Sequence, residues 1–272
     1  MSYPPDHHLL RDLCVSSYWT GDLESRFIAP LVPEIARPDG AMAAGALFAV
    51  ADLAAASTAI AGAGEDWAGT LDLSVRMKGA IDTGPLIIDG AVLRAGGTLL
   101  TVRSELYDGE GTEEPRRFVG MTIGGFRRMK RNADYNAGPV EVREIGVRRD
   151  WARPDSGFAG PLLEEIGLRE LSPGVVELDK SAYVTNSFGT INGGTTGIVI
   201  VAGAESAVGP GFTAVDVDVR YIGQAKEGPA RTACEVLRVG ADHAVVDVML
   251  LDESQDRRPI AAGSVTLVTA PN

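Results

Sequence analysis

An internal repeat limits the possible folds of this 272-residue chain more than any other feature. Residues 71–108 align with residues 215–252 at a constant offset of 144, without gaps. The identical positions include a Gly-Pro pair and a Val-Leu-Arg-x-Gly run. In the N-terminal repeat they are Asp72, Val75, Arg76, Gly79, Gly84, Pro85, Val92, Leu93, Arg94, Gly96, Val102, Leu106 and Asp108. Two copies of one module predict two similar domains in tandem.

Both repeats show the same order of predicted elements. Each begins with an extended segment, at 25–35 in the N-terminal repeat and at 175–184 in the C-terminal repeat. A glycine-containing turn then leads into an apolar helix, at 42–60 and at 194–208. Four predicted strands follow, at 70–77, 86–93, 99–107 and 118–126, and at 213–222, 230–239, 244–251 and 260–268. The alternation of apolar and charged residues from Val215 to Tyr221 is typical of an antiparallel strand with one buried face. We therefore expect an α+β fold in which each domain is an antiparallel sheet wrapped around a buried helix.

The predicted domain boundaries follow from the composition between the repeats. Residues 129–160 mix basic side chains with Asn, Pro and Gly, which is typical of a linker. We assign residues 1–128 to an N-terminal domain and residues 161–272 to a C-terminal domain.

Charge and composition exclude several classes of function. With 25 Lys and Arg against 37 Asp and Glu, the net charge of −12 disfavours binding to nucleic acid or to an anionic membrane. Cys14 and Cys234 lack metal-ligand spacing and predict neither a disulfide framework nor a metal site. The first residues lack a secretory pattern, so we expect a cytoplasmic protein. Residues 41–61 are apolar enough to span a bilayer, but the central Asp52 favours a buried core helix.

The turns before the two helices carry the most informative residues. The C-terminal repeat reads Asn186-Ser-Phe-Gly189-Thr-Ile-Asn192-Gly193-Gly194. The N-terminal repeat reads Arg37-Pro-Asp-Gly40-Ala-Met-Ala43-Ala44-Gly45, and Asp52 follows nine residues after Ala43. Val201 stands at the corresponding helical position of the C-terminal repeat.

The element order and these turns resemble the hotdog fold, and in particular the PaaI-like thioesterases. That family carries Asn-x-x-Gly-x-x-His-Gly-Gly before the helix and an Asp nine residues after the His. Here Asn192 replaces the histidine. The resemblance implies a pair of hotdog domains in which the turn of one faces the helical acid of the other. It therefore implies hydrolysis of acyl-CoA thioesters at one composite site, because the acid survives in one repeat and the turn in the other.

In this composite site, the resemblance gives each residue a role. Asp52 would act as general base or as nucleophile, Gly193 would donate to the oxyanion, Asn186 would orient the reacting groups and Thr70 would position water. Gly194 and Asn192 would contact the substrate. The pseudo-symmetric twin site has Arg37, Ala44, Val201 and Ala214 instead. Glu205, one helical turn after Val201, is a weaker candidate for a replacement acid.

A coenzyme A substrate brings phosphates, which need a basic patch. The densest basic run contains Arg127 and Arg128, and Lys226 lies after a strand of the C-terminal repeat. We expect these three residues to contact the phosphates, although a charge run is also typical of a solvated surface. We expect no metal and no cofactor beyond the coenzyme A of the substrate, and a homodimer.

Two other functions remain open from the sequence. The missing histidine and the degenerate twin also fit a non-catalytic acyl-CoA binding or scaffold protein. A hotdog dehydratase acting on 3-hydroxyacyl thioesters is a further alternative, but the helices lack the Asp-x-x-x-x-His pair that those enzymes carry.

Overall fold

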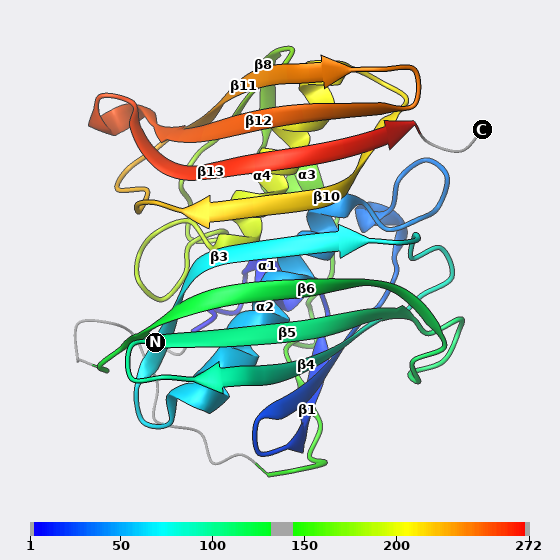
Figure 1. Cartoon of the computed structure of the whole chain (residues 1–272), viewed down its shortest axis with the longest axis vertical. Helices are drawn as coiled ribbons and strands as arrows, with labels where there is room; N and C mark the ends of the chain where they lie inside the picture. Colours follow the sequence, from blue (N-terminus) through cyan, green and yellow to red (C-terminus); the bar gives the residue numbers. More distant parts are fainter. Residues whose placement is uncertain (1–2, 132–143, 270–272) are drawn as a thin grey trace.

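The computed structural model describes residues 3–131 and 144–269, and over these residues the two repeats build one 13-stranded antiparallel sheet. Its strand order is β7-β1-β2-β4-β5-β6-β3-β10-β13-β12-β11-β9-β8 (Figure 1). The strands up to the linker are β1 (Ser16–Gly21), β2 (Glu24–Ala29), β3 (Trp67–Met77), β4 (Leu86–Ala95), β5 (Leu99–Asp108) and β6 (Arg117–Met129). The others are β7 (Arg149–Asp150), β8 (Arg169–Ser172), β9 (Val175–Leu178), β10 (Phe212–Tyr221), β11 (Ala230–Val239), β12 (His243–Asp252) and β13 (Arg258–Thr269).

Both long helices lie on the same side of the sheet (Figure 1). They are α2 (Ala44–Ala63) and α4 (Gly193–Val208), and the shorter helical segments are α1 (Leu9–Asp12), η1 (Pro33–Ile35), α3 (Leu162–Glu165) and η2 (Glu253–Gln255). By length and composition α2 could cross a membrane, but 78% of its most apolar stretch is buried inside the protein. The predicted α+β architecture is confirmed, with the sheets of the two repeats joined into one and each half covering one helix.

Strands β3 and β10 join the two halves edge to edge. Ser74 pairs with Asp218, the residue at its own position in the other repeat. On either side of that pair, Asp72 lies opposite Arg220 and Arg76 lies opposite Asp216. A pseudo-two-fold axis therefore passes through this strand pair, as in a symmetric dimer.

Glycines allow α2 and α4 to pack closely. A Cβ atom on Gly197 would lie 2.0 Å from Cδ1 of Phe48, and one on Gly194 would lie 2.8 Å from Cα of Ala49. Interior packing leaves no room for such atoms. The C-terminal repeat therefore needs glycine at both positions for the two helices to cross.

Part of the sequence repeat is explained by loop anchoring. The buried carboxylate of Asp108 accepts hydrogen bonds from the backbone N–H groups of residues 82, 83 and 110. The buried Asp252 accepts equivalent bonds from the backbone of residues 226, 228 and 254. These recurring aspartates hold the loops at the ends of the strands.

The structure corrects the first predicted segment of each repeat. Strand β2 ends at Ala29 instead of extending to Ile35, because Pro30 and Pro33 offer no amide hydrogen to the sheet. Likewise β9 ends at Leu178, and the short strands β1 and β8 precede β2 and β9 without having been predicted. Part of the predicted linker, residues 132–143, lies outside the described residues.

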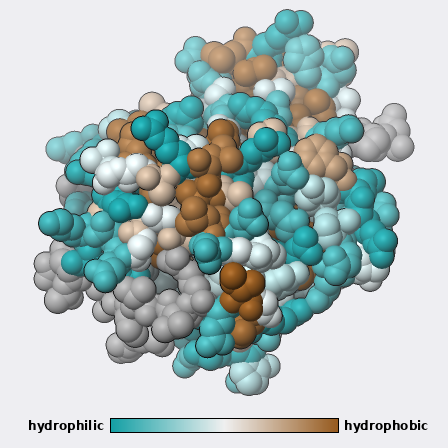
Figure 2. Space-filling view, turned by 60° about the horizontal axis from the view of Figure 1, so that its bottom comes forward, coloured by the Kyte–Doolittle hydropathy of each residue, from teal (hydrophilic) through white to brown (hydrophobic). Residues whose placement is uncertain are grey.

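Some large apolar side chains remain exposed, among them Leu93, Leu99 and Leu237, each more than half exposed. Seen from the lower end of Figure 1, apolar groups form a narrow band within a mostly hydrophilic surface (Figure 2). A patch of this kind is compatible with a protein partner. The homodimer stays a prediction.

The helix crossing generates a stability prediction. Gly197→Ala should lower the free energy of unfolding by about 2 kcal/mol or more, because the new methyl group overlaps the Phe48 ring. Gly45→Ala is the matched control, since its Cβ would lie 3.4 Å from Cα of Ile198 and alanine favours the helix. Urea unfolding followed by circular dichroism measures both variants. Equal stability of the two variants would contradict the proposed packing constraint.

Candidate active site

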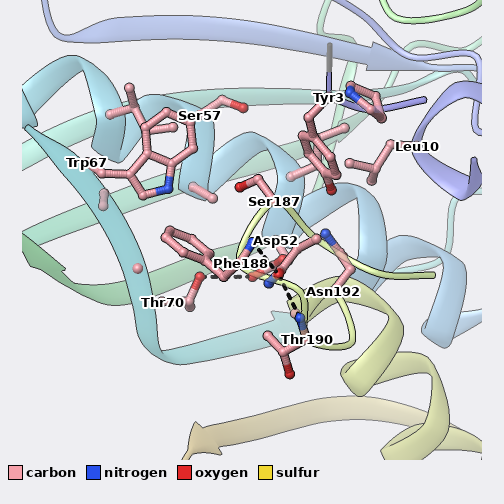
Figure 3. A pocket seen from close by; sticks show the side chains of 18 of the residues that line it. Tyr3, Leu10, Asp52, Ser57, Trp67, Thr70, Ser187, Phe188, Thr190 and Asn192 are labelled. Atoms are coloured by element: carbon pink, nitrogen blue, oxygen red, sulfur yellow. Dashed lines mark hydrogen bonds between the residues drawn. The ribbon is translucent and has the colours of Figure 1, made fainter. Parts of the chain in front are cut away.

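A cavity of about 860 Å³ lies between the two halves of the chain. Its walls come from α2, the start of β3, the β1–β2 hairpin, residues 186–193 before and at the start of α4, and segments 3–11 and 149–153. Figure 3 shows Asp52, Thr70 and Asn192 together, with Trp67 and Phe188 to one side. The cavity is of the size and apolar character that small-molecule sites usually have.

Asp52 projects from α2 toward the beginning of α4. The carboxylate is 5% exposed, and a Cβ atom on Gly193 would lie 2.8 Å from its Oδ2. Burial raises the pKa of Asp52 to about 7, while the backbone N–H of Gly194 and the Thr70 hydroxyl lower it. The structure therefore brings the acid of the N-terminal repeat into contact with the glycine turn of the C-terminal repeat.

Three contacts organise the first turn of α4. Asn192 is the N-cap, and its Oδ1 accepts a 2.8 Å hydrogen bond from the Gly194 N–H. The Tyr221 hydroxyl donates to the Gly193 carbonyl at 2.9 Å. No described residue accepts a hydrogen bond from the Gly193 N–H, which lies at the positive end of the helix dipole. Gly193 lines the cavity, whereas Gly194 packs against Ala49 of α2.

A β-bulge aims Thr70 at Asp52. Strand β3 shifts register between Thr70 and Asp72, which leaves Leu71 with 36% of its surface exposed. The Thr70 hydroxyl donates to Asp52 Oδ1 over a long 3.4 Å. The C-terminal repeat has the same bulge between Ala214 and Asp216, but alanine has no hydroxyl to present.

Asn186 holds the loop that covers the cavity. Its Oδ1 accepts hydrogen bonds from the backbone N–H groups of Phe188 at 2.9 Å and of Thr190 at 3.2 Å. The residue lines the cavity, but this oxygen serves the loop. Asn186 is therefore placed to orient the loop and Phe188 above Asp52.

The structure separates the three predicted phosphate contacts. Arg127 lines the cavity. Arg128 points to the other face of β6 and donates to the Gly62 carbonyl of α2 at 2.6 Å. Lys226 has an exposed side chain beside a cavity-lining residue, and its backbone N–H is held by Asp252.

The pseudo-symmetric twin site has none of the groups predicted for the composite site. Val201 is buried where the acid would stand, and none of Arg37, Ala44, Val201 and Ala214 lines the cavity. Glu205 Oε1 accepts a hydrogen bond from the Ala214 N–H at 3.1 Å, and burial raises its pKa. Glu205 thus supports the start of β10 instead of facing the cavity.

Sequence reasoning missed two tyrosines of this site, Tyr3 and Tyr221. The alternation along β10 placed Tyr221 on the buried face but gave no reason to link it to Gly193. Tyr3 lies outside the repeat, so neither the repeat nor the turn motif pointed to it. Within residues 3–131 and 144–269, no three His, Cys, Asp or Glu side chains form a group that could hold a metal.

The environment of Asp52 predicts how stability changes with pH. A carboxyl with a folded-state pKa of about 7 keeps its proton between about pH 4 and 7, where the unfolded chain has lost it. Its contribution to stability is therefore complete below about pH 4 and is lost as pH rises to about 7, by up to about 4 kcal/mol.

Asp52→Asn cannot ionise and should escape this loss. Chemical denaturation should show the variant more stable than the wild type at pH 8, with a difference that shrinks toward pH 4. Parallel pH dependence of the two proteins would contradict the raised pKa.

Known protein families match both repeats. A model described as the thioesterase superfamily matches residues 39–115, and one described as the acyl-CoA thioesterase N-terminal domain matches residues 184–268. Together they span more than half of the chain. No curated protein sequence matches the chain significantly.

Solved structures match nearly the whole chain. The tesB protein of Mycobacterium avium subs. paratuberculosis is 13% identical, with a TM-score of 0.61 over 94% of this chain and 96% of that one. The 12:0-ACP thioesterase from Umbellularia californica is 11% identical, with a TM-score of 0.59 over 91% and 95%. A protein with a hot dog fold from Alicyclobacillus acidocaldarius is 12% identical, with a TM-score of 0.56 over 91% and 94%. These likenesses show the fold, the two family models identify the superfamily, and the chain is a tandem hotdog protein of the thioesterase superfamily.

Proposed function

We propose that this protein hydrolyses acyl-CoA thioesters at the cavity between its two halves. The observation that carries this proposal is the contact between a buried carboxylate and the start of a helix inside a large, mostly apolar cavity. Thioester hydrolysis needs a base to activate water and a donor for the negative charge that forms on the carbonyl oxygen. Asp52 and the Gly193 N–H are suited to these two tasks.

In the proposed reaction, the Asp52 carboxylate takes a proton from a water molecule that the Thr70 hydroxyl positions. The resulting hydroxide attacks the thioester carbonyl carbon, and the carbonyl oxygen gains negative charge beside the Gly193 N–H. Collapse of the tetrahedral intermediate breaks the C–S bond, and the leaving thiolate takes the proton from Asp52. The products are a carboxylic acid and a free thiol. A pKa near 7 supports the role of base, because it matches a neutral working pH.

Other residues support the reaction by holding these groups in place. Asn192 caps α4. The Tyr221 hydroxyl donates to the Gly193 carbonyl and so fixes the peptide group between residues 193 and 194. A Cβ at residue 193 would push against the Asp52 carboxylate, so glycine is needed for the contact. Asn192 and Tyr221 position the helix end without touching the reacting atoms.

Arg127 supports coenzyme A as the carrier. It lies on the cavity wall, and Arg131, another lining residue, stacks over Trp67 with 4.6 Å from Cζ to the ring centroid. Guanidinium groups beside Trp67, on the wall of the cavity, suit the phosphates of the carrier. Arg128 supports α2 through the Gly62 carbonyl, and Lys226 directly follows the cavity-lining Ala225.

The apolar walls support a bulky acyl group. Leu53, Ala56 and Ile60 form one face of α2, and aromatic side chains from β1, β2 and β3 line the space around it. The spacing of these helical residues is that of a single stripe along the cavity. An acetyl group would leave most of this apolar surface uncovered.

Removing the proposed base tests the function. Asp52→Asn should lower kcat by about 10²–10⁴-fold, because the amide cannot accept the proton of water. Glu205→Gln, which changes the half-buried carboxyl one helical turn after Val201, is the matched control and should keep wild-type turnover. Thiol release from decanoyl-CoA, and from the same acyl group on acyl-carrier protein, measures both variants and the carrier preference. Undiminished hydrolysis by Asp52→Asn would exclude this mechanism, and tight binding of acyl-CoA without hydrolysis by the wild type would select the scaffold function.

Filling the cavity tests the acyl preference. Ala56→Phe should reduce kcat/KM for decanoyl-CoA at least about 10-fold, because the new ring occupies space in the apolar stripe. Acetyl-CoA serves as the internal control, and its kcat/KM should change little. An equal loss for both substrates would show that the acyl group lies elsewhere.

A further inference from the structure

The N-terminal segment crosses from one repeat to the other and closes one side of the cavity. The Leu9 N–H donates to the Tyr183 carbonyl at 3.0 Å, and the Tyr183 hydroxyl donates to Asp12 at 2.9 Å. The Leu10 N–H donates to Nδ1 of His8 at 3.1 Å, which leaves Nε2–H to donate to the Thr185 carbonyl at 3.0 Å. The segment is therefore fixed to the C-terminal repeat just before the loop that leads to α4.

Tyr3 stands at the end of this fixed segment and lines the same cavity as Asp52. In Figure 3 its ring lies across the cavity from Trp67 and on the same side as Asn192. Its ring also packs edge-on against His8, with 5.3 Å between centroids. The Arg11 guanidinium donates to the Pro4 carbonyl at 2.7 Å, which fixes the backbone directly after Tyr3.

The hydroxyl of Tyr3 lacks a protein acceptor. Its oxygen is buried, and none of the described residues accepts a hydrogen bond from it. Burial raises the pKa of Tyr3 strongly; the Asn192 side chain lowers it and the charge of Asp52 raises it. The group therefore stays protonated and can donate, and a buried donor without an acceptor is unfavourable. A ligand that supplies an acceptor would remove this unfavourable contribution.

We propose that the Tyr3 hydroxyl donates a hydrogen bond to the thioester carbonyl oxygen and acts with the Gly193 N–H as the second oxyanion donor. This inference rests on the proposed thioester hydrolysis. The carbonyl oxygen is the polar acceptor that the substrate brings next to Asp52, and it gains negative charge during attack. The leaving thiolate has little need of this proton, because a thiol has a pKa of about 8.5. The phenol keeps its proton throughout, so no bond to hydrogen is broken at Tyr3.

Tyr3→Phe tests this role because it removes one oxygen and keeps the ring. We expect kcat to fall about 10²-fold with little change in KM, the size of loss found when one oxyanion donor is removed. Tyr107→Phe is the matched control. The Tyr107 hydroxyl donates to a Glu105 carboxylate oxygen at 2.6 Å, and Tyr107 does not line the cavity. The enzyme should carry its purification tag at the C-terminus, so that no added residues lie next to Tyr3.

A second measurement separates catalysis from packing. A trifluoromethyl ketone analogue of the acyl-CoA adds water to give a tetrahedral hydrate, in which one oxygen occupies the place of the oxyanion. This analogue should bind Tyr3→Phe about 10²-fold more weakly than wild type. The corresponding thioether, which has no carbonyl, should bind both equally. Wild-type kcat and analogue affinity in Tyr3→Phe would overturn the inference, while the loss of activity in Asp52→Asn would leave the proposed function standing. Equal weakening of analogue and thioether would also overturn it, because it would mean that the hydroxyl serves only to shape the cavity.

Discussion

The close crossing of α2 and α4 is the constraint on which the rest of the site depends. A carboxylate inside an apolar helix is unfavourable unless polar groups face it. Here the crossing brings Asp52 against the first turn of α4, where the backbone N–H groups have no intrahelical acceptors. This proximity requires glycine at 193, 194 and 197, since any side chain would meet Asp52, Ala49 or Phe48. The glycine-rich turn thus serves packing and electrostatics together.

Joining two modules in one chain permits the asymmetry that the structure displays. In a symmetric homodimer every substitution appears in both sites, so the two sites must change together. Here the two positions are related only by pseudo-symmetry about the Ser74–Asp218 pair. Val201 fills one position with apolar volume, and Glu205 there binds a strand backbone. The twin site could therefore lose its polar groups while the site around Asp52 kept them.

Peripheral segments complete the cavity. Helix α2 is apolar on every side, and the central strands of the sheet cover only one of its sides. The N-terminal segment, the β1–β2 hairpin toward one end of the sheet and residues 149–153 line the cavity beside the helix. This explains why the helix has no polar stripe despite belonging to an α+β protein. It also places Tyr3, at the very start of the described chain, beside residues that are far away in sequence.

The sequence by itself determined the repeat, the alternation of buried and exposed residues along β10, and the pairing of a surviving acid with a surviving turn. These follow from periodicity and spacing, which are local properties. It did not determine where β2 ends, the strands β1 and β8, or the separation of Arg127 from Arg128 across β6. It also gave no sign that a bulge aims Thr70 at Asp52, because regular alternation from the buried Leu73 would turn Thr70 away from α2. Only the tertiary structure decided that Tyr3 and Tyr221 line the same cavity as Asp52, since that depends on how distant segments pack.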